Sequence, residues 1–313
     1  NSTQFGSVIT PCFNEQDNIA AFYAALTGVP GISDVIGEII FVDDGSTDNT
    51  YEVVRSLAEK DHRVKCLRFS RNFGSHAALS AGLRRASGAF AVILSADLQD
   101  PPELIPELVK QWQAGFHVVW ATRRSREDSG VKKELASLFY TVLRRIALPQ
   151  YPPEGMDFGL FDRRVLDEFK AMGETQPFIT GAILWMGFRQ TTIPYDRRSR
   201  RSGSSKWSMS KMIKLAIAAI AGFSSLPVRL VSVLGAVLCA IGLCGGALLV
   251  LLYLAGVRDV WQWFPLAAIL FVLQGIQLLM LGIVGEYVLK GAEQANGRPP
   301  FIVMEELGFD SEK

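Results

Sequence analysis

Charged residues are missing from two long stretches of this sequence, and the charges elsewhere nearly balance. No Asp, Glu, Lys, Arg or His occurs from Leu230 to Val257 or from Val260 to Gly285. A helix needs roughly 20 apolar residues to cross a bilayer, and each stretch is longer than that. Buried core helices are also apolar all round, but two consecutive ones of this length are rare in a soluble domain. The stretches therefore predict two transmembrane helices. The formal net charge of +1 argues against a nucleic-acid-binding protein.

The distribution of basic residues predicts the orientation in the membrane. The connection "VRDVWQW" is too short to form a domain, so the stretches predict a hairpin with both chain ends on one side. The only basic residue in the hairpin loop is Arg258. The basic residues before the hairpin are Arg197, Arg198, Arg200, Arg201, Lys206, Lys211, Lys214 and Arg229. The positive-inside bias places the N-terminal domain and both termini in the cytoplasm. Because no basic segment followed by an apolar one opens the sequence, we expect no secretory signal peptide.

Cysteine and the glycine-rich nucleotide motifs are also scarce or missing. The four cysteines show no C-x-x-C spacing, and two lie within a predicted span, so we expect neither a disulfide framework nor a zinc site. The sequence contains no G-x-G-x-x-G and no G-x-x-x-x-G-K-[ST]. A bound nucleotide would therefore be held by carboxylates and a metal rather than by a glycine-rich phosphate loop.

Short apolar runs alternate with segments of helical periodicity from the N-terminus to about residue 195. The runs at 7–11, 38–44, 64–70, 89–97 and 117–123 predict buried strands. The segments at 16–26, 49–60, 75–86 and 101–113 predict helices, the second after the capping cluster "GSTD" and the fourth after two prolines. This alternation predicts an α/β domain with a mostly parallel sheet.

Polar clusters follow four of the predicted strands. They are "PCFNE", "DDGSTD", "SRN" and "SADLQD". Ligands of parallel sheets bind beyond the carboxyl ends of the strands. One or two such clusters are ordinary turns, but four at one edge predict a binding site.

These motifs carry a family resemblance. "VITPCFNEQDNI", "IIFVDDGSTDNT", "RFSRNFGSHAAL" and "SADLQDPPEL" resemble the successive motifs of family 2 glycosyltransferases with the GT-A (Rossmann-like) fold. "GMDFGLFDRRV", the pattern R-x-x-R-x-x-G-x-S-K in "RRSRRSGSSKW", and "FSSLPVRL" before the hairpin narrow the match. They resemble polyisoprenyl-phosphate glycosyltransferases, the group that holds dolichol-phosphate mannose synthases and bactoprenol glucosyltransferases. The resemblance covers essentially the whole chain.

The resemblance implies a metal site after the fourth strand. Asp97 and Gln99 match the family's metal-binding positions, and hard Mg²⁺ or Mn²⁺ prefers such oxygen ligands. The metal would neutralise the charge that develops on the departing nucleoside diphosphate. The family pattern is usually D-x-D-x-Q, and Ser95 stands at its first position here, which weakens any nucleotide contact made there. An acidic helix N-terminus is the competing interpretation, and it fits Asp100 better than Asp97.

The resemblance also implies a nucleotide-sugar pocket. Asp44 would contact the base, and Glu15 with Pro11 would line the base and ribose pocket, whereas a turn-forming Asp before Gly45 is the alternative for Asp44. The remaining candidates are basic residues that follow the third and fifth strands, namely Arg71, Arg123 and Arg126. Their guanidinium groups suit phosphate. For Arg71 a solvated surface charge fits equally well.

The candidate residues for orienting and binding the acceptor lie later in the sequence. Asp157 in "GMDFG", with Asp97, is a candidate catalytic residue. A lipid phosphate has a second pKa of about 6 and is already nucleophilic at neutral pH. Asp157 would therefore orient the donor or the acceptor rather than act as a strong base, and a turn acid before a strand is the structural alternative. The family pattern assigns the lipid phosphate to Arg197, Arg200, Ser205 and Lys206. Attraction to anionic lipid is the competing explanation for these basic residues.

The sequence thus predicts four segments. A cytoplasmic GT-A catalytic domain spans 1–205, and an amphipathic interfacial helix spans 206–228, with packing on the soluble domain as the alternative for that helix. Two transmembrane helices at about 230–256 and 262–288 lie within 229–290, and a cytoplasmic tail spans 291–313. We expect an integral membrane protein of a bacterial inner membrane that forms a homo-oligomer.

The expected activity is transfer of one hexose with inversion. The resemblance favours glucose, carried from UDP-glucose to undecaprenyl phosphate, because a two-helix anchor is similar to the bacterial glucosyltransferase branch. GDP-mannose with dolichyl phosphate is the alternative. A non-catalytic, membrane-tethered nucleotide-sugar scaffold is the rival from another class, with Ser95 in its favour and Asp97, Gln99 and Asp157 against it.

Overall fold

The computed structural model describes residues 5–124, 158–172, 179–196, 263–295 and 299–309, together with a few positions between 233 and 255. The chain divides into two compact units. One consists of Asn1–Ala216 with Arg298–Lys313, and the other of Ile217–Gly297. The C-terminal residues therefore belong to the same unit as the N-terminal domain.

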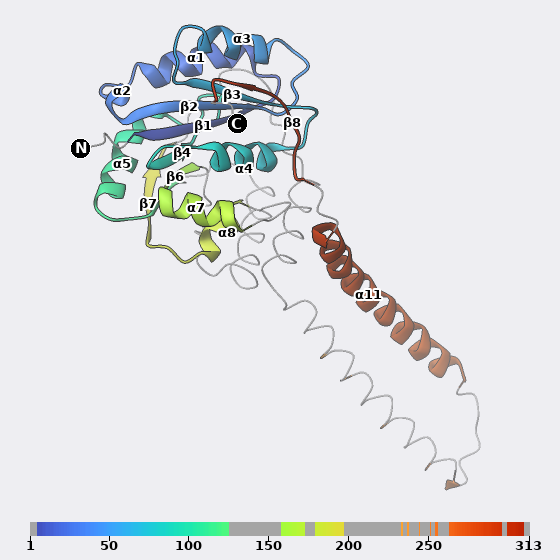
Figure 1. The fold of residues 1–313 in the computed structure, drawn as a ribbon. Helices are drawn as coiled ribbons and strands as arrows, with labels where there is room; N and C mark the ends of the chain where they lie inside the picture. Colours follow the sequence, from blue (N-terminus) through green and yellow to red (C-terminus); the bar gives the residue numbers. More distant parts are fainter. Residues whose placement is uncertain are drawn as a thin grey trace. The chain divides into compact units, whose positions relative to one another are not determined.

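The first unit alternates strands and helices along most of its length (Figure 1). The strands are β1 (Gly6–Cys12), β2 (Ile36–Asp43), β3 (Val64–Phe69), β4 (Phe90–Ile93), β5 (Val118–Arg123), β6 (Phe158–Asp162), β7 (Gln190–Tyr195) and β8 (Val303–Leu307). The helices are α1 (Gln16–Thr27), α2 (Ile32–Val35), α3 (Thr50–Ala58), α4 (Ser75–Arg85), the 3₁₀ turn η1 (Pro102–Leu104), α5 (Ile105–Gln113), α7 (Arg163–Ala171) and α8 (Ile179–Trp185). The five strands and four helices predicted before residue 124 are confirmed within a few residues.

The strands form one eight-stranded sheet in the order β7-β5-β6-β4-β1-β2-β3-β8. The β1–β2, β1–β4, β2–β3 and β5–β7 pairs are parallel. Strand β6 runs antiparallel between β4 and β5, and β8 runs antiparallel along β3. The mostly parallel sheet that the sequence predicts is confirmed, with two antiparallel strands that it did not predict.

Helices cover both faces of the sheet. Helices α1, α3 and α5 pack on one face, and α4, α7 and α8 pack on the other (Figure 1). The central strands are buried on both sides, which is why "IIFV" of β2 and "FAVI" of β4 read as continuous apolar runs rather than alternating ones. Side chains such as Phe22, Phe41 and Phe90 are fully buried between the layers. The packed core fixes where each strand ends, and the polar loops follow from there.

From Trp263 onwards, the second apolar stretch lies on one continuous helix, α11 (Trp263–Ala295). Large apolar side chains along it are exposed, among them Ile269, Val272, Leu281 and Val288. Within the described part of the chain, no helix meets the combined length and hydropathy expected of a membrane span. Most of the predicted first span, and the whole predicted interfacial helix at 206–228, lie outside the described residues.

Candidate functional site

The four polar clusters meet at one edge of the sheet. Strands β4, β1, β2 and β3 are neighbours and run parallel, so their carboxyl ends lie side by side. The register pairs Cys12 with Asp43, and the amide of Leu94 donates to the Ile9 carbonyl at 3.0 Å. The clusters "PCFNE", "DDGSTD", "SRN" and "SADLQD" therefore form one rim, as the sequence predicts.

Hydrogen bonds join the loop after β1 to the loop after β2. The Asn14 amide donates to Ser46 Oγ at 2.9 Å, and the Glu15 amide donates to Thr50 Oγ1 at 2.9 Å. In return, the Thr47 amide donates to the Asn14 side-chain oxygen at 2.9 Å. Asn14 adopts a left-handed backbone conformation with a φ of 53°. Non-glycine residues in this region cluster at functional sites, because the surrounding contacts must hold the strain.

The predicted pocket residues Pro11 and Glu15 lie near where the loop after β1 begins and ends. Pro11 is the second-last residue of β1 and pairs with Val42. Glu15 precedes α1, where its carboxylate accepts a hydrogen bond from the Asn18 side chain at 2.6 Å. Asp48, which sequence reasoning favoured as a helix cap, accepts from the Thr50 amide at 3.0 Å at the start of α3.

Asp44 ties the end of β2 to the loop after β3. Its carboxylate accepts hydrogen bonds from the amides of Phe73 at 2.6 Å and Gly74 at 2.9 Å. Burial raises the pKa of Asp44, and the charge of Asp43 adds to this, while the two backbone donors oppose it. An ionised carboxylate can accept about four hydrogen bonds, so Asp44 retains capacity for a further donor. It is thus fixed in position and able to accept from a ligand.

Gly45 allows the two loops to touch. Its φ is +68°, and a Cβ placed there would lie 2.4 Å from the backbone carbon of Arg71. Only glycine meets both requirements, because other residues rarely adopt this conformation and would collide with the neighbouring backbone. The Arg71 side chain itself is exposed, and its guanidinium stacks 4.2 Å from the ring centre of Phe73. Arg71 therefore lies on the rim, as predicted, and packs on an aromatic ring there.

The loop after β4 holds its acids in a strained turn. Leu98 has a φ of 59°, and this places the Gln99 amide 3.2 Å from Asp97 Oδ1. Asp97 is 7% exposed, whereas Gln99 is half-buried. The two predicted metal ligands therefore lie on either side of a strained leucine, which keeps both at the rim.

Asp100 is the centre of a buried polar cluster. Its side chain is 3% exposed, and it accepts hydrogen bonds from the Ser95 hydroxyl and, at 2.8 Å, from the Tyr195 hydroxyl. Sequence reasoning gave Asp100 the role of an acid at a helix N-terminus. Asp100 lies two residues before η1, and its side chain also joins the segment after β4 to the end of β7. An Asp at position 95, as in the usual family pattern, would bring a second carboxylate against Asp100.

The remaining candidates belong to the other half of the rim. Arg123 ends β5 and pairs in register with Tyr195, the last residue of β7. Strands β5 and β7 are parallel neighbours, so Arg123 and Tyr195 lie at the same edge of the sheet. Strand β6 begins at Phe158, opposite Ala121 of β5. Arg126, Asp157, Arg197, Arg200, Ser205 and Lys206 lie outside the described residues.

The donor set at Asp97 and Gln99 suits a metal that arrives with its ligand. Within the residues that the structure describes, no three His, Cys, Asp or Glu side chains come together as a metal cage. One carboxylate and one amide leave most positions of an octahedral ion for phosphate oxygens and water. Mg²⁺ sites commonly have this composition, with one or two protein oxygens plus substrate phosphates. The residues present therefore fit a shared metal rather than a fully protein-held one.

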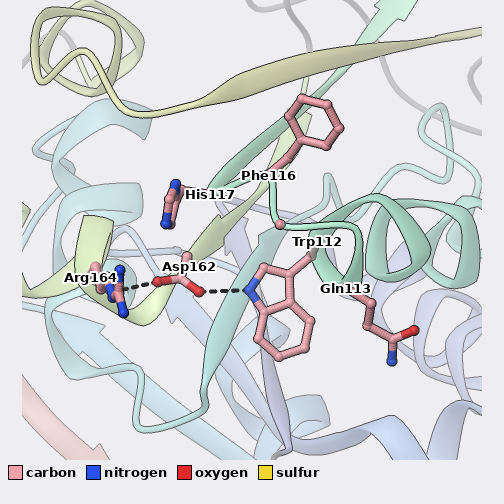
Figure 2. A pocket seen from close by; sticks show the side chains of 7 residues that line it. Trp112, Gln113, Phe116, His117, Asp162 and Arg164 are labelled. Carbon is pink, nitrogen blue, oxygen red and sulfur yellow. Dashed lines mark hydrogen bonds between the residues drawn. The ribbon is translucent and has the colours of Figure 1, made fainter.

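A cavity of about 450 Å³ lies away from this rim. Trp112, Phe116, His117, Asp162 and Arg164 line it, and Figure 2 shows Asp162 between Trp112 and Arg164. Asp162 accepts from Trp112 Nε1 at 2.7 Å and from the Arg164 amide at 2.9 Å, which caps α7. The cavity lies where β5 begins and β6 ends, at the sheet edge opposite the polar loops. None of the predicted site residues that the structure describes lines it.

Three residues at the rim were not predicted as site residues from the sequence, namely Asp43, Tyr195 and Glu305. Asp43 is fully buried and lies 3.6 Å from Arg68 Nε, and Glu305 of β8 lies 3.2 Å from Arg68 Nη1. Tyr195 was missed because "TTIPYD" carries no motif. The pair "DD" after a buried strand was a visible signal for Asp43, since two adjacent buried acids require a cation. Nothing local in "VMEEL" pointed to Glu305.

A mostly parallel sheet covered on both faces, with buried carboxylates on loops at its carboxyl edge, is the GT-A arrangement of nucleotide-sugar-dependent glycosyltransferases. The family model that matches this chain is described as glycosyl transferase family 2 and covers residues 7–170. The chain belongs to this family. The predicted resemblance, the GT-A fold and the enzyme class are confirmed.

Relatives match over nearly the whole chain. The glycosyltransferase YkcC of Bacillus subtilis is 37% identical over 98% of this chain and 95% of its own length. The bactoprenol glucosyl transferase of Shigella phage SfV is 34% identical over 96% of this chain and 98% of its own. A solved structure, glucosyl-3-phosphoglycerate synthase from Mycobacterium tuberculosis with Mn²⁺, UDP and phosphoglyceric acid, is 18% identical with a TM-score of 0.47, covering 70% of this chain and 76% of that one.

Proposed function

We propose that this enzyme transfers glucose from UDP-glucose to a polyprenyl phosphate at a membrane surface and inverts the anomeric configuration. One observation carries the proposal: 34% identity to a bactoprenol glucosyl transferase extends over 96% of the chain. The rim supports it, because buried carboxylates and adjacent arginine-bearing strand ends suit a nucleotide diphosphate. No specific observation favours GDP-mannose.

The donor would lie across the loops after β1, β2 and β4. Asp44, held by two backbone amides, would accept a hydrogen bond from the base, and Pro11 and Glu15 would line the same pocket. Asp97 and Gln99 would hold the divalent ion on the diphosphate, and that ion neutralises charge on the leaving group when bound. Arg71 follows β3, Arg123 ends β5 and Arg126 comes shortly after it in the sequence, and their guanidinium groups would pair with phosphate oxygens.

The acceptor would approach from the half of the rim formed by β5 and β7. Arg197, Arg200, Ser205 and Lys206 follow β7 directly in the sequence and would bind the lipid phosphate. A phosphate monoester is mostly a dianion at neutral pH and needs no strong base to attack the anomeric carbon. Asp157, which immediately precedes β6, would then orient the reacting groups rather than remove a proton.

We further propose that the charge-free stretches form a membrane hairpin with the catalytic unit on the cytoplasmic side. The two stretches in the sequence and the exposed apolar side chains of α11 support this. A membrane location also fits an acceptor whose polyprenyl chain is insoluble in water. The basic residues before the first stretch support the orientation.

A nucleotide-sugar panel tests the activity. The full chain in detergent is incubated with polyprenyl phosphate, Mn²⁺ and labelled UDP-glucose, UDP-galactose or GDP-mannose, and the lipid fraction is counted. We expect label in an acidic glycolipid from UDP-glucose. Asp97→Asn is the matched control, since it keeps the size of the side chain and removes its charge. Incorporation from GDP-mannose alone would show that GDP-mannose rather than UDP-glucose is the donor. No transfer from any donor would favour the non-catalytic scaffold.

A protease experiment tests the topology. In sealed vesicles with the cytoplasmic face inward, both termini should resist protease, and in inverted vesicles both should be cut. A tag inserted between Val257 and Gln262 should show the opposite pattern. Cleavage of the tag and the termini from the same side would contradict a hairpin.

A further inference from the structure

Strand β8 comes from the C-terminal end of the chain and completes the sheet. It pairs antiparallel with β3, with Cys66 opposite Leu307 and Phe69 opposite Val303. The pairing continues into the loop, because the Ser70 amide donates to the Ile302 carbonyl at 3.0 Å. Ser70 is the first residue of the loop whose later amides hold Asp44. A segment that sequence reasoning treated as a tail therefore reaches the rim.

The two faces of β8 carry one glutamate each. Glu305 contacts Arg68, while the next residue, Glu306, forms an ion pair with Arg85 of α4. Successive side chains of a strand point to opposite faces of the sheet, so the two ion pairs lie on opposite sides. The two carboxylates are similarly exposed, at 43% and 40%. The two glutamates differ mainly in the residues that their arginine partners contact in turn.

Glu305 is connected to the end of β2 through Arg68. The guanidinium of Arg68 lies 4.6 Å from the ring centre of Tyr51, with Glu305 on one side and Asp43 on the other. Burial raises the pKa of Tyr51 to about 12, and its hydrogen bond with Glu305 adds to this shift. Asp43 is fully buried, and its Oδ2 has no hydrogen-bond partner among the described residues. A buried carboxylate needs a counter-charge, and Arg68 supplies it only while it is held in place.

A second contact path runs through aromatic rings. Phe301, just before β8, stacks on Phe69 with ring centres 5.0 Å apart. Phe69 meets Phe73 edge-on at 5.8 Å, and Phe73 donates its amide to Asp44. The ion pair of Glu305, together with the backbone and aromatic contacts of the two residues before β8, therefore leads to Asp43, Asp44 or the loop between β3 and α4.

We propose that β8 positions the pocket for the nucleoside diphosphate, with Glu305 as a positioning residue that acts through Arg68 and Asp43. This inference rests on the proposed function, since it assigns the nucleotide to the rim at Asp44. It makes donor binding depend on a strand that follows the apolar helix α11 in the chain. Glu306, on the other face, only fastens the strand to α4.

Matched charge-neutral variants test the proposal in the full chain. Glu305→Gln and Glu306→Gln are compared for binding of UDP with Mn²⁺ by calorimetry, for KM of donor and acceptor, and for Tm. We expect Glu305→Gln to weaken UDP binding and raise the donor KM by about fivefold or more. The acceptor KM should stay unchanged, and Glu306→Gln should remain within about twofold of the wild type, as for most exposed ion pairs.

Hydrogen exchange gives a readout that does not depend on the nucleotide. Amides of residues 70–74 should exchange faster in Glu305→Gln than in Glu306→Gln, at equal Tm, because loss of the Glu305–Arg68 ion pair weakens the attachment of β8 to the end of β3, where this loop begins. Tyr51→Phe, which keeps the ring under Arg68 and removes its hydroxyl, should give a smaller change in the same direction. UDP binding and loop exchange in Glu305→Gln that equal those of the wild type would overturn the inference. So would equal effects of the two glutamate variants. A wild type that binds no nucleoside diphosphate would instead refute the proposed function, and the exchange data would still decide whether β8 holds the loop.

Discussion

Replacing Ser95 by Asp, the residue of the usual family pattern, should destabilise this protein. Asp100 is 3% exposed and already accepts hydrogen bonds from Ser95 and Tyr195. The substitution exchanges a donor for a second carboxylate at hydrogen-bond distance. Two like charges about 4 Å apart repel by about 4 kcal/mol at an effective dielectric constant of 20. Ser95→Ala, the matched control, removes only the hydrogen bond to a charged group, which contributes about 1.5 to 3 kcal/mol.

Thermal unfolding at pH 7 with EDTA present measures the difference, since a chelator prevents a metal ion from neutralising the pair. In a catalytic unit of this size 1 kcal/mol corresponds to about 2–4 °C. Ser95→Ala should therefore lower Tm by about 3–12 °C, and Ser95→Asp should lower it further.

The pH dependence of the stability loss in Ser95→Asp tests whether charge repulsion causes it. Repulsion raises the pKa of the paired carboxyls in the folded state above the unfolded value of about 4. The folded state then binds an extra proton between these two pKa values, so the deficit of Ser95→Asp should shrink as the pH falls towards 4 and grow as it rises. A Ser95→Asp protein as stable as Ser95→Ala at pH 7 would show that the two side chains do not meet in solution.

Three further predictions address the donor and acceptor sites. Asp97→Asn should lower turnover by orders of magnitude, and excess EDTA should have the same effect on the wild type. Full activity of the wild type in EDTA would exclude a role of Asp97 and Gln99 as metal ligands. Gly45→Ala should destabilise the fold by at least about 2 kcal/mol, because it adds a backbone collision to the strain at positive φ. Gly31→Ala, where φ is also positive but the space is open, should show the strain alone, and equal Tm losses would refute the collision. Arg200→Ala and Lys206→Ala should raise the KM for polyprenyl phosphate while calorimetric UDP binding changes little, and a loss of UDP affinity as severe as that of Asp97→Asn would assign this loop to the donor.

The sequence predicted the parallel half of the sheet because its signals are local. Strands β1 to β5 are apolar runs, the first four followed by polar clusters, and α1, α3, α4 and α5 carry helical periodicity, with recognisable starts for α3 and α5. The rim followed from one geometric rule, since neighbouring parallel strands end at the same edge. Asp44, Asp97 and Gln99 could thus be placed at the rim without knowing any distance.

The contacts between distant segments could not be predicted in this way. Strand β8 is a short edge strand, "VMEEL", with two adjacent glutamates, and such a segment is equally typical of a solvated tail. Asp100 meets Tyr195 across 95 residues of chain, and Glu305 meets Arg68 across 237. These pairings depend on the strand order β7-β5-β6-β4-β1-β2-β3-β8, which hydrophobic periodicity does not encode. The sequence by itself determined that the loops after β1, β2, β3 and β4 lie at the carboxyl edge, because the ends of these strands are set by local burial. Only the tertiary structure decided which of those side chains hold one another, because long-range pairing brings their strands together.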